Sequence, residues 1–312
     1  MKWILDIIIR LIATLATAVR VQAEREITHS ELSDRGDMPE EEALVAAVND
    51  TIASRQSEER TAQVAPSLVH DSEQDEEHPT LIKPDLLIVI DPGHGPATRG
   101  KRSPRLPDGR RFLEYEYNYA VGDLVTHALL TRHTDNVINT VHEWRRQRPD
   151  TPMGNDLRFR VAVANDACRR HRSVYGDDGE AIFISIHANA APQPHPEAWV
   201  PSVRGVETWY YRGSEEGRLL AMTVHPYLAA VAIEHMHSRD RGIKYHREGQ
   251  RPFYVLAHTI MPSVLLETGF YTHPEEVLLL MDDEVRQLMA AAIVNGIIDY
   301  ARKKGKTYEQ HA

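Results

Sequence analysis

Two histidines and a glutamate each follow a short apolar run of the sequence. The runs cover residues 86–90, 181–186 and 262–266, and the residues beyond them include His94, His187 and Glu267. The first run is too short for a helix and too uniformly apolar for a half-exposed strand, which predicts a buried strand. The other two runs have the same architecture, so we expect three buried strands. In open α/β sheets, ligands bind at the carboxyl ends of parallel strands. We therefore expect His94, His187 and Glu267 to meet at one edge of one sheet.

These residue types suit a catalytic zinc ion, which takes three protein ligands such as imidazole and carboxylate groups and keeps a fourth position for water. His94 and His187 supply two ligands. The third should be an acid near the start of a helix, where the chain offers Glu114 and Glu116. At helical spacing these two side chains lie about 200° apart, so only one of them can face a metal. The residues themselves leave this choice open.

Nucleophilic catalysis by a side chain is not favoured. Ser185 lies inside the second apolar run with no base beside it in the sequence. The single cysteine, Cys168, excludes an internal disulfide framework. It falls on one helical face with Val161 and Ala164, which predicts that it packs in the core.

The elements that must position these residues begin near Asp85, where apolar runs start to alternate with helical patterns. This alternation predicts an α/β fold with a mostly parallel central sheet flanked by helices. Helices are expected at residues 114–131, 155–172, 217–237 and 274–304, and further strands at 137–141 and 205–211. Pro226 predicts a kink or a break in the third helix. We expect one catalytic domain at residues 84–305 and a tail at 306–312.

The acidity of the chain is concentrated before this domain. The formal net charge is −10; residues 24–83 hold 16 acidic and 5 basic side chains, whereas residues 84–312 hold 29 acidic and 28 basic ones. A nearly neutral domain offers no overall basic field for nucleic acid. The acidic segment should be largely flexible. Residues 40–54 are the exception, since their apolar spacing allows an amphipathic helix that docks on the domain or on a regulatory protein.

Residues 1–23 resemble a secretory signal peptide. They begin with Met-Lys, continue through an apolar stretch and end in Val-Gln-Ala. Asp6 and Arg10 interrupt the apolar stretch, so an amphipathic helix or an uncleaved anchor is the alternative. We expect export to the periplasm or cell envelope, with no stable membrane span once the signal is cleaved.

Four short motifs follow one another along the predicted domain. They are Asp91–Gly95, Glu116–Asn118, Ser185–Asn189 and Leu266–Phe270. In this order, over residues 85–303, they resemble the zinc-dependent N-acetylmuramoyl-L-alanine amidases of bacterial cell-wall remodelling. The resemblance implies that His94, Glu116 and His187 bind one zinc ion per chain and that Glu267 is the catalytic acid/base. It favours Glu116 over Glu114, because the family's ligand glutamate precedes an asparagine by two positions.

The resemblance also implies a reaction. The substrate would be peptidoglycan, and the bond would be the amide between the lactyl group of N-acetylmuramic acid and L-alanine. One alternative is a zinc peptidase that cuts within the stem peptide. Another is a non-catalytic wall-binding or activator protein with the same fold.

Several residues near the predicted strand ends stay without an assigned role. A basic stretch over residues 99–111 is either a solvated loop or a rim that attracts anions of the cell wall. Gly95 is followed by Pro96, where the family commonly has a second glycine. The other residues without a role are His246, His273, Asn189 and Arg204.

Overall fold

The computed structural model describes residues 79–98 and 100–308. All of them belong to the compact unit Val69–Ala312. The expectations for the signal peptide, for the acidic segment up to residue 78 and for the helix at residues 40–54 lie outside the described residues. So do residues 309–312 of the expected tail. Among the described residues, we find no helix with the length and apolar character that crossing a membrane requires.

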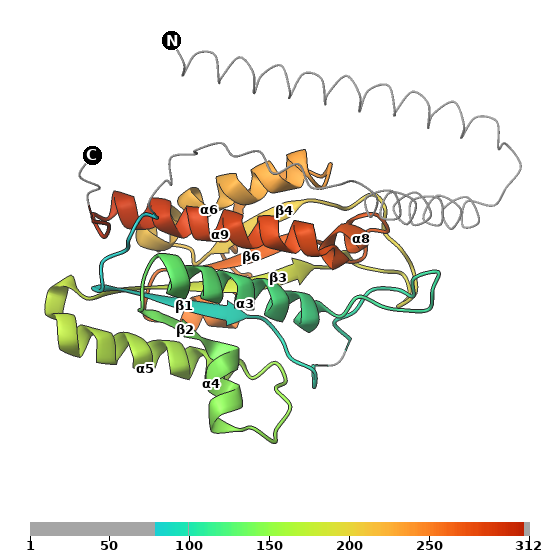
Figure 1. The fold of residues 1–312 in the computed structure, drawn as a ribbon. Helices are drawn as coiled ribbons and strands as arrows, with labels where there is room; N and C mark the ends of the chain where they lie inside the picture. The colour runs from blue at the N-terminus through green and yellow to red at the C-terminus, as the bar shows by residue number, and fades with distance from the viewer. Residues whose placement is uncertain (1–78, 99, 309–312) are drawn as a thin grey trace, which may run out of the picture. The chain divides into compact units, whose positions relative to one another are not determined.

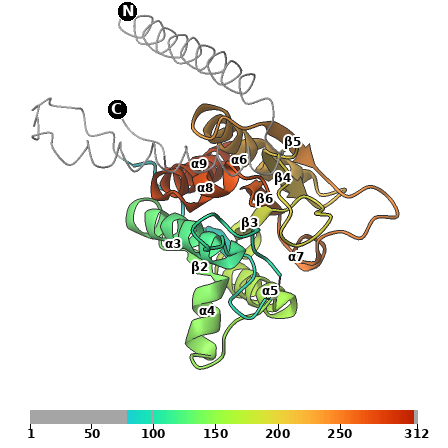
Figure 2. The same cartoon turned by 90° about the vertical axis from the view of Figure 1, so that its right-hand side faces the viewer.

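A six-stranded sheet forms the centre of the fold, as Figures 1 and 2 show. Its strands are β1 (Leu86–Pro92), β2 (Val137–Asn139), β3 (Glu180–Asn189), β4 (Val206–Tyr210), β5 (Asp240–Lys244) and β6 (Ser263–Phe270). Their order across the sheet is β2-β1-β3-β6-β4-β5. The β4–β6 pair is antiparallel, and the other neighbouring pairs of these strands are parallel. The predicted mostly parallel sheet is therefore confirmed.

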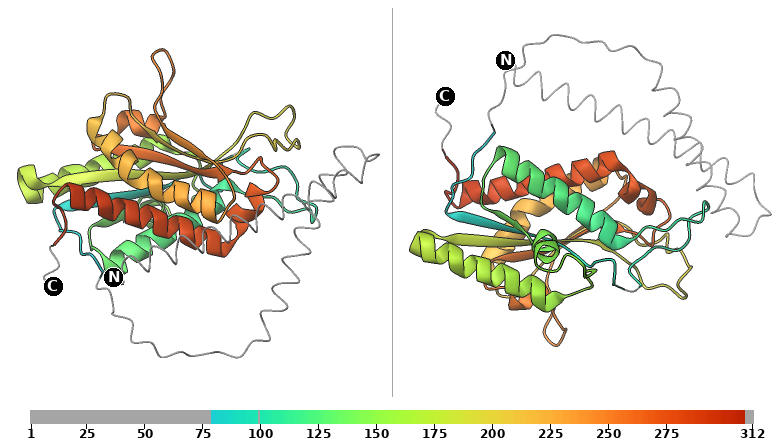
Figure 3. Two further views of the ribbon diagram at one scale, coloured as in Figure 1. Left: turned by 90° about the horizontal axis from the view of Figure 1, so that it is seen from above. Right: turned by 60° about the horizontal axis from the view of Figure 1, so that its bottom comes forward.

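Helices cover both faces of this sheet. One face carries α3 (Glu114–Arg132), α6 (Glu215–Glu234) and α9 (Asp283–Lys303), and the other carries α5 (Leu157–Tyr175) and α7 (Tyr254–His258). In the right-hand view of Figure 3, α3 and α9 lie on the opposite side of the strands from α5. The described residues also form three further short helices, α4 (Thr140–Gln147), η1 (Gly176–Asp178) and α8 (Glu276–Met281). This arrangement confirms the predicted α/β fold.

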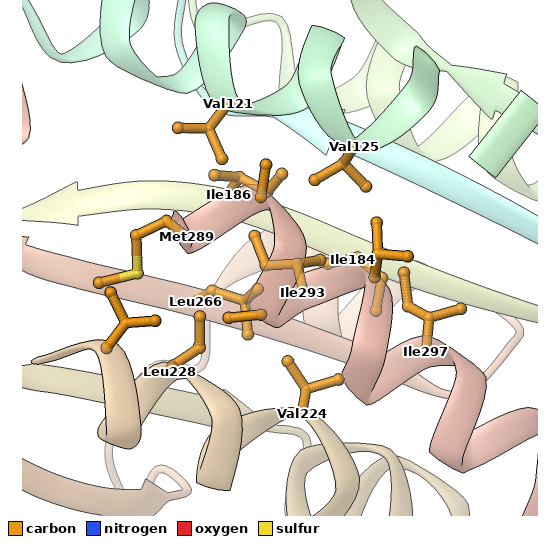
Figure 4. Close-up of a cluster of buried hydrophobic side chains, with 14 of the residues drawn as sticks. Val121, Val125, Ile184, Ile186, Val224, Leu228, Leu266, Met289, Ile293 and Ile297 are labelled. Atoms are coloured by element: carbon orange, nitrogen blue, oxygen red, sulfur yellow. The ribbon is translucent and has the colours of Figure 1, made fainter. Parts of the chain in front are cut away.

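Strand alternation sends apolar side chains to both helical layers, since successive residues of a strand point to opposite faces. Ile184 and Ile186 of β3 pack beneath α3 and α9, as Figure 4 shows, whereas Phe183 packs on the α5 side. The crossing of α6 and α9 depends on Gly296. A Cβ atom on Gly296 would lie 2.5 Å from the Cα of Val224, so a larger residue would push these helices apart.

The structure corrects several expected boundaries. The expected strand at residues 137–141 ends at Asn139, whose side chain accepts hydrogen bonds from the first amides of α4. The expected last helix is two helices, α8 and α9, with Asp282 as the N-cap of the second. Helix α6 is not broken at Pro226. The strand β5 and the helix α7 were not predicted. Cys168 is buried in α5, as expected.

Candidate functional site

Carboxylates and an imidazole form a row across the end of the sheet. The register pairs His187 of β3 with Glu267 of β6, and Glu267 with Glu207 of β4. His94 follows the end of β1, the neighbour of β3 on the other side. His94, His187 and Glu267 line one pocket of about 350 Å³. The structure thus brings these three predicted site residues together at one edge of the sheet.

Glu114, at the start of α3, lies between the two histidines. Its Oε1 atom is 3.1 Å from Nε2 of His94 and 3.0 Å from Nδ1 of His187. Glu116 is exposed and accepts a hydrogen bond from the hydroxyl of Tyr115. The expectation that Glu116 joins the histidines is therefore wrong, and Glu114 takes that place.

Helix geometry explains the correction. The buried side of the first turns of α3 includes Glu114, Tyr117, Asn118 and Val121, at spacings of three and four residues. Glu116 is two positions from Glu114, so its side chain points away from that side. Sequence reasoning was right that one glutamate alone can face the pocket. The choice between them failed because it rested on the distance to Asn118.

The three side chains offer a suitable set of metal ligands. One ligand atom from each of His94, Glu114 and His187 lies within 4.8 Å of the others. The second oxygen of Glu114 is buried without a hydrogen-bond partner among the described residues. A buried carboxylate with an unused oxygen, facing two ring nitrogens, is stabilised by a cation between them. Two imidazoles and a carboxylate are also the donor set of catalytic zinc sites.

The orientation of His94 is fixed by its neighbours. Its Nδ1 atom lies 3.1 Å from Oδ1 of Asn155, which leaves Nε2 directed at Glu114. The backbone of His94 has a φ of 61°, a left-handed conformation that non-glycine residues seldom adopt. Its carbonyl accepts hydrogen bonds from Arg160 and from the hydroxyl of Tyr119. These bonds hold the unusual backbone in place.

Arg160 ties helix α5 to the end of β1. Its Nη1 atom donates to Oδ1 of Asp91 at 2.7 Å and to the carbonyl of Pro92 at 2.6 Å. Asp91 also accepts hydrogen bonds from Thr140 and Ser185. Burial alone would raise the pKa of Asp91, but Arg160 and these hydrogen bonds outweigh burial and lower the pKa below 3.8. The loop that carries His94 is therefore anchored on an ionised, buried pair.

Gly93 allows the imidazole of His187 to pack directly against the loop. A Cβ atom at position 93 would lie 2.1 Å from Cε1 of His187. The amide of Gly93 donates to the carbonyl of Ile186, and its carbonyl accepts from the Asn118 side chain. A glycine is thus required for the close approach of this loop to the ring.

Glu267 is poised to take up a proton. Burial raises its pKa well above 4.5, and the negative charges of Glu114 and Glu207 raise it further, while Lys101 acts in the opposite direction. One carboxylate oxygen of Glu267 is buried without a hydrogen-bond partner among the described residues. A carboxylate with a raised proton affinity suits general acid/base chemistry at neutral pH.

Glu207 is held by two cations from β5. Its Oε1 atom lies 2.6 Å from Nε of Arg241 and 2.6 Å from Nζ of Lys244, and its Oε2 atom accepts from the indole of Trp209. Sequence reasoning missed Arg241 and Lys244 because β5 was not predicted. For Glu207, the alternation of residues 205–211 was the available signal, since it places Glu207 and Trp209 on one face of their strand.

Four residues had no assigned role in the sequence analysis. Asn189 lines the pocket, and Arg204, His246 and His273 do not. Arg204 instead binds Glu275 and two backbone carbonyls. His273 accepts hydrogen bonds from the backbone amides of Glu275 and Glu276 at the start of α8. His246 packs against aromatic rings, with ring centroids 4.8 Å from Trp209 and 4.7 Å from Phe253.

Comparison with known proteins gives a consistent result. The sequence model of the N-acetylmuramoyl-L-alanine amidase family matches residues 88–299. The uncharacterized protein YqiI of Bacillus subtilis (strain 168) is 31% identical over 216 residues, which cover 68% of this chain and 84% of YqiI. The N-acetylmuramoyl-L-alanine amidase LytC of the same organism is 30% identical over 218 residues, 69% of this chain. The chain spans 35% of the length of LytC.

Two solved structures share the fold. An N-acetylmuramoyl-L-alanine amidase from Clostridium difficile 630 matches with a TM-score of 0.52 and 26% identity, over 70% of this chain and 98% of that chain. The amidase AmiC2 of Nostoc punctiforme matches with a TM-score of 0.50 and 30% identity, over the same shares of the two chains.

Proposed function

The chain belongs to the N-acetylmuramoyl-L-alanine amidase family, and from this membership we propose that it is a zinc-dependent hydrolase of peptidoglycan. The bond is the amide between the lactyl group of N-acetylmuramic acid and L-alanine. The ligands of the zinc ion are His94, Glu114 and His187, with one ion per chain, and Glu267 is the catalytic acid/base.

One observation carries this proposal. Glu267, a buried carboxylate with an unused oxygen, lines the same pocket as the cluster of His94, Glu114 and His187. Metal-assisted hydrolysis needs a metal ion and a proton acceptor on the same water molecule. The pocket supplies a ligand set for the first and a carboxylate for the second.

The residues of the chain divide the chemistry between them. A bound zinc ion lowers the pKa of water to about 7 and polarises a carbonyl oxygen. Glu267 accepts the proton of the attacking water and passes it to the nitrogen of the departing amine. The peptide therefore leaves with a neutral amino group on its L-alanine. Before a cation binds, Glu114 is already a carboxylate, because hydrogen bonds with the imidazoles of His187 and His94 outweigh the effect of burial and lower its pKa to about 2.

The proposed place of action is the bacterial cell envelope, where peptidoglycan lies. The family relatives named cell wall amidases support this location.

The test is digestion of purified peptidoglycan sacculi by the full-length protein, with and without a chelator. We expect chelator-sensitive release of intact peptides, which leaves glycan strands with free lactyl carboxylates. New amino ends at L-alanine, identified by mass spectrometry, would confirm the bond. Cleavage inside the stem peptide would instead indicate a peptidase, and binding without any cleavage would indicate a wall-binding protein.

A further inference from the structure

The basic stretch near the pocket is largely paired with partners of its own. Nε of Arg110 lies 2.6 Å from Oδ2 of Asp108. Arg111 forms an ion pair with Glu197, whose other carboxylate oxygen accepts from the backbone amide of Arg105. These arginines are therefore committed to holding the loop. Lys101 and Arg102 form no ion pair or side-chain hydrogen bond with another described residue.

Lys101 differs from Arg102 in its position. Lys101 lines the pocket that contains the two histidines and Glu267, and Arg102 does not. The backbone carbonyl of Lys101 accepts a hydrogen bond of 3.0 Å from the amide of Glu114. This bond fixes Lys101 beside the residue that reaches both histidines.

Backbone pairing between the two sides of the loop stabilises this position. Arg102 and Leu113 form an isolated antiparallel bridge. The amide of Ser103 donates to the carbonyl of Phe112 at 3.0 Å, and the amide of Phe112 donates to the Ser103 hydroxyl at 3.0 Å. The start of the basic stretch is thus joined to the start of α3.

The other full charges around the pocket have specific partners or a catalytic role. Asp91 is paired with Arg160, and Glu114 lies between the imidazoles. A substrate that brings a negative charge into this pocket meets the carboxylate of Glu267, which repels it. Lys101 supplies a cation whose three donors are available to that charge.

We propose that Lys101 binds a carboxylate of the substrate peptide close to the scissile amide, and so sets a preference for acidic peptides. The inference rests on the proposed function for the identity of the substrate. Arg102, the neighbouring cation outside the pocket, does not contribute to this preference.

The test compares two synthetic substrates with three forms of the protein. In both substrates, N-acetylmuramic acid is linked to a dipeptide that begins with L-alanine. The second residue ends in a free carboxylate in one substrate and in the matching carboxamide in the other. The proteins are the unmodified chain, Lys101→Met and the matched control Arg102→Met. Cleavage gives kcat/KM, and titration calorimetry on Glu267→Gln versions of each form gives affinity without turnover.

We expect Lys101→Met to lower kcat/KM and affinity for the carboxylate substrate about tenfold, the effect of one charge-assisted hydrogen bond. The Glu267→Gln forms lack the carboxylate on which the charge of Lys101 acts, so on these forms the affinity for the carboxamide substrate should change less than about twofold, and Arg102→Met should affect neither substrate. An equal loss of affinity for both substrates on these forms would overturn the proposal, because Lys101 would then not distinguish the carboxylate. No loss for either would also overturn it. A carboxylate preference in binding that depends on Lys101, without cleavage, would support this inference and contradict the amidase activity.

Discussion

The guanidinium of Arg160 lies 2.7 Å from the carboxylate of Asp91, and each side chain is 1% exposed. The pair joins helix α5 to the end of β1. Because the same guanidinium also donates to the carbonyl of His94, the position of one proposed metal ligand depends on a helix that supplies no ligand itself.

Replacing Arg160 should therefore lower the stability of the protein. Arg160→Met leaves Asp91 buried without its cation, which should lower the free energy of unfolding by about 3–5 kcal/mol. Arg170→Met is the matched control, because Arg170 lies on the same helix and pairs with Asp166 at an exposed position. The control should change stability by less than about 1 kcal/mol. Urea unfolding measures the free energy of unfolding of each variant. Equal losses in Arg160→Met and Arg170→Met would contradict the role assigned to Arg160.

A methyl group at position 93 should displace His187. Gly93→Ala places a Cβ atom into the imidazole, so we expect at least a tenfold loss of zinc affinity in competition with a chromogenic chelator. Gly154→Ala is the control, since its Cβ atom would lie 3.3 Å from the flexible carboxylate of Asp156. A Gly93→Ala protein with unchanged zinc affinity would show that the loop tolerates the group.

The ion pairs of Glu207 should make stability depend on pH. Burial alone would raise the pKa of Glu207, but Lys244 and Arg241 outweigh it and lower the pKa below 4.5. The folded state thus favours the carboxylate, so the stabilisation is complete above the unfolded pKa and is lost as the pH falls through the lower folded value.

Comparison with Glu207→Gln isolates this contribution. The difference in free energy of unfolding between the unmodified chain and the variant should shrink from about pH 6 to about pH 3. The exposed Glu248, which pairs with Arg212, supplies the control Glu248→Gln, with little change over the same range. A difference for Glu207→Gln that stays constant with pH would refute the lowered pKa.

Much of the fold was predictable because it depends on short-range patterns. The buried runs that became β1, β3 and β6 are apolar on both faces, and helix α5 shows its apolar stripe clearly. The strand β5 was missed because its sequence, Asp-Arg-Gly-Ile-Lys, has no apolar alternation. It is a strand because β4 pairs with it, and a pairing partner is not visible in the local sequence.

The site was predictable where residues directly follow strands and less so where a helix or a distant residue contributes. The sequence does not show which of Glu114 and Glu116 faces the pocket. Ala120 and Leu124 give the Glu116 side of α3 an apolar character as well. Arg160 is visible in the sequence as a charge within the apolar face of α5 defined by Val161 and Ala164. A charge at such a position indicates a buried partner.

Removal of the proposed proton acceptor should separate metal binding from turnover. Glu267→Gln keeps the size of the side chain but cannot accept the proton, so kcat should fall by about 10²–10⁴. The zinc content should stay at one ion per chain, because Glu267 is not among the proposed ligands. A variant that retains its full rate would show that another group performs the proton transfer.

The zinc content of the purified protein, with anomalous diffraction at the zinc edge, tests the central claim most directly. We predict one zinc ion bonded to His94, Glu114 and His187, retention of the ion in Glu116→Gln and its loss in Glu114→Gln. A protein that binds no zinc, or a zinc ion that stays bound in Glu114→Gln and is lost in Glu116→Gln, would contradict the account.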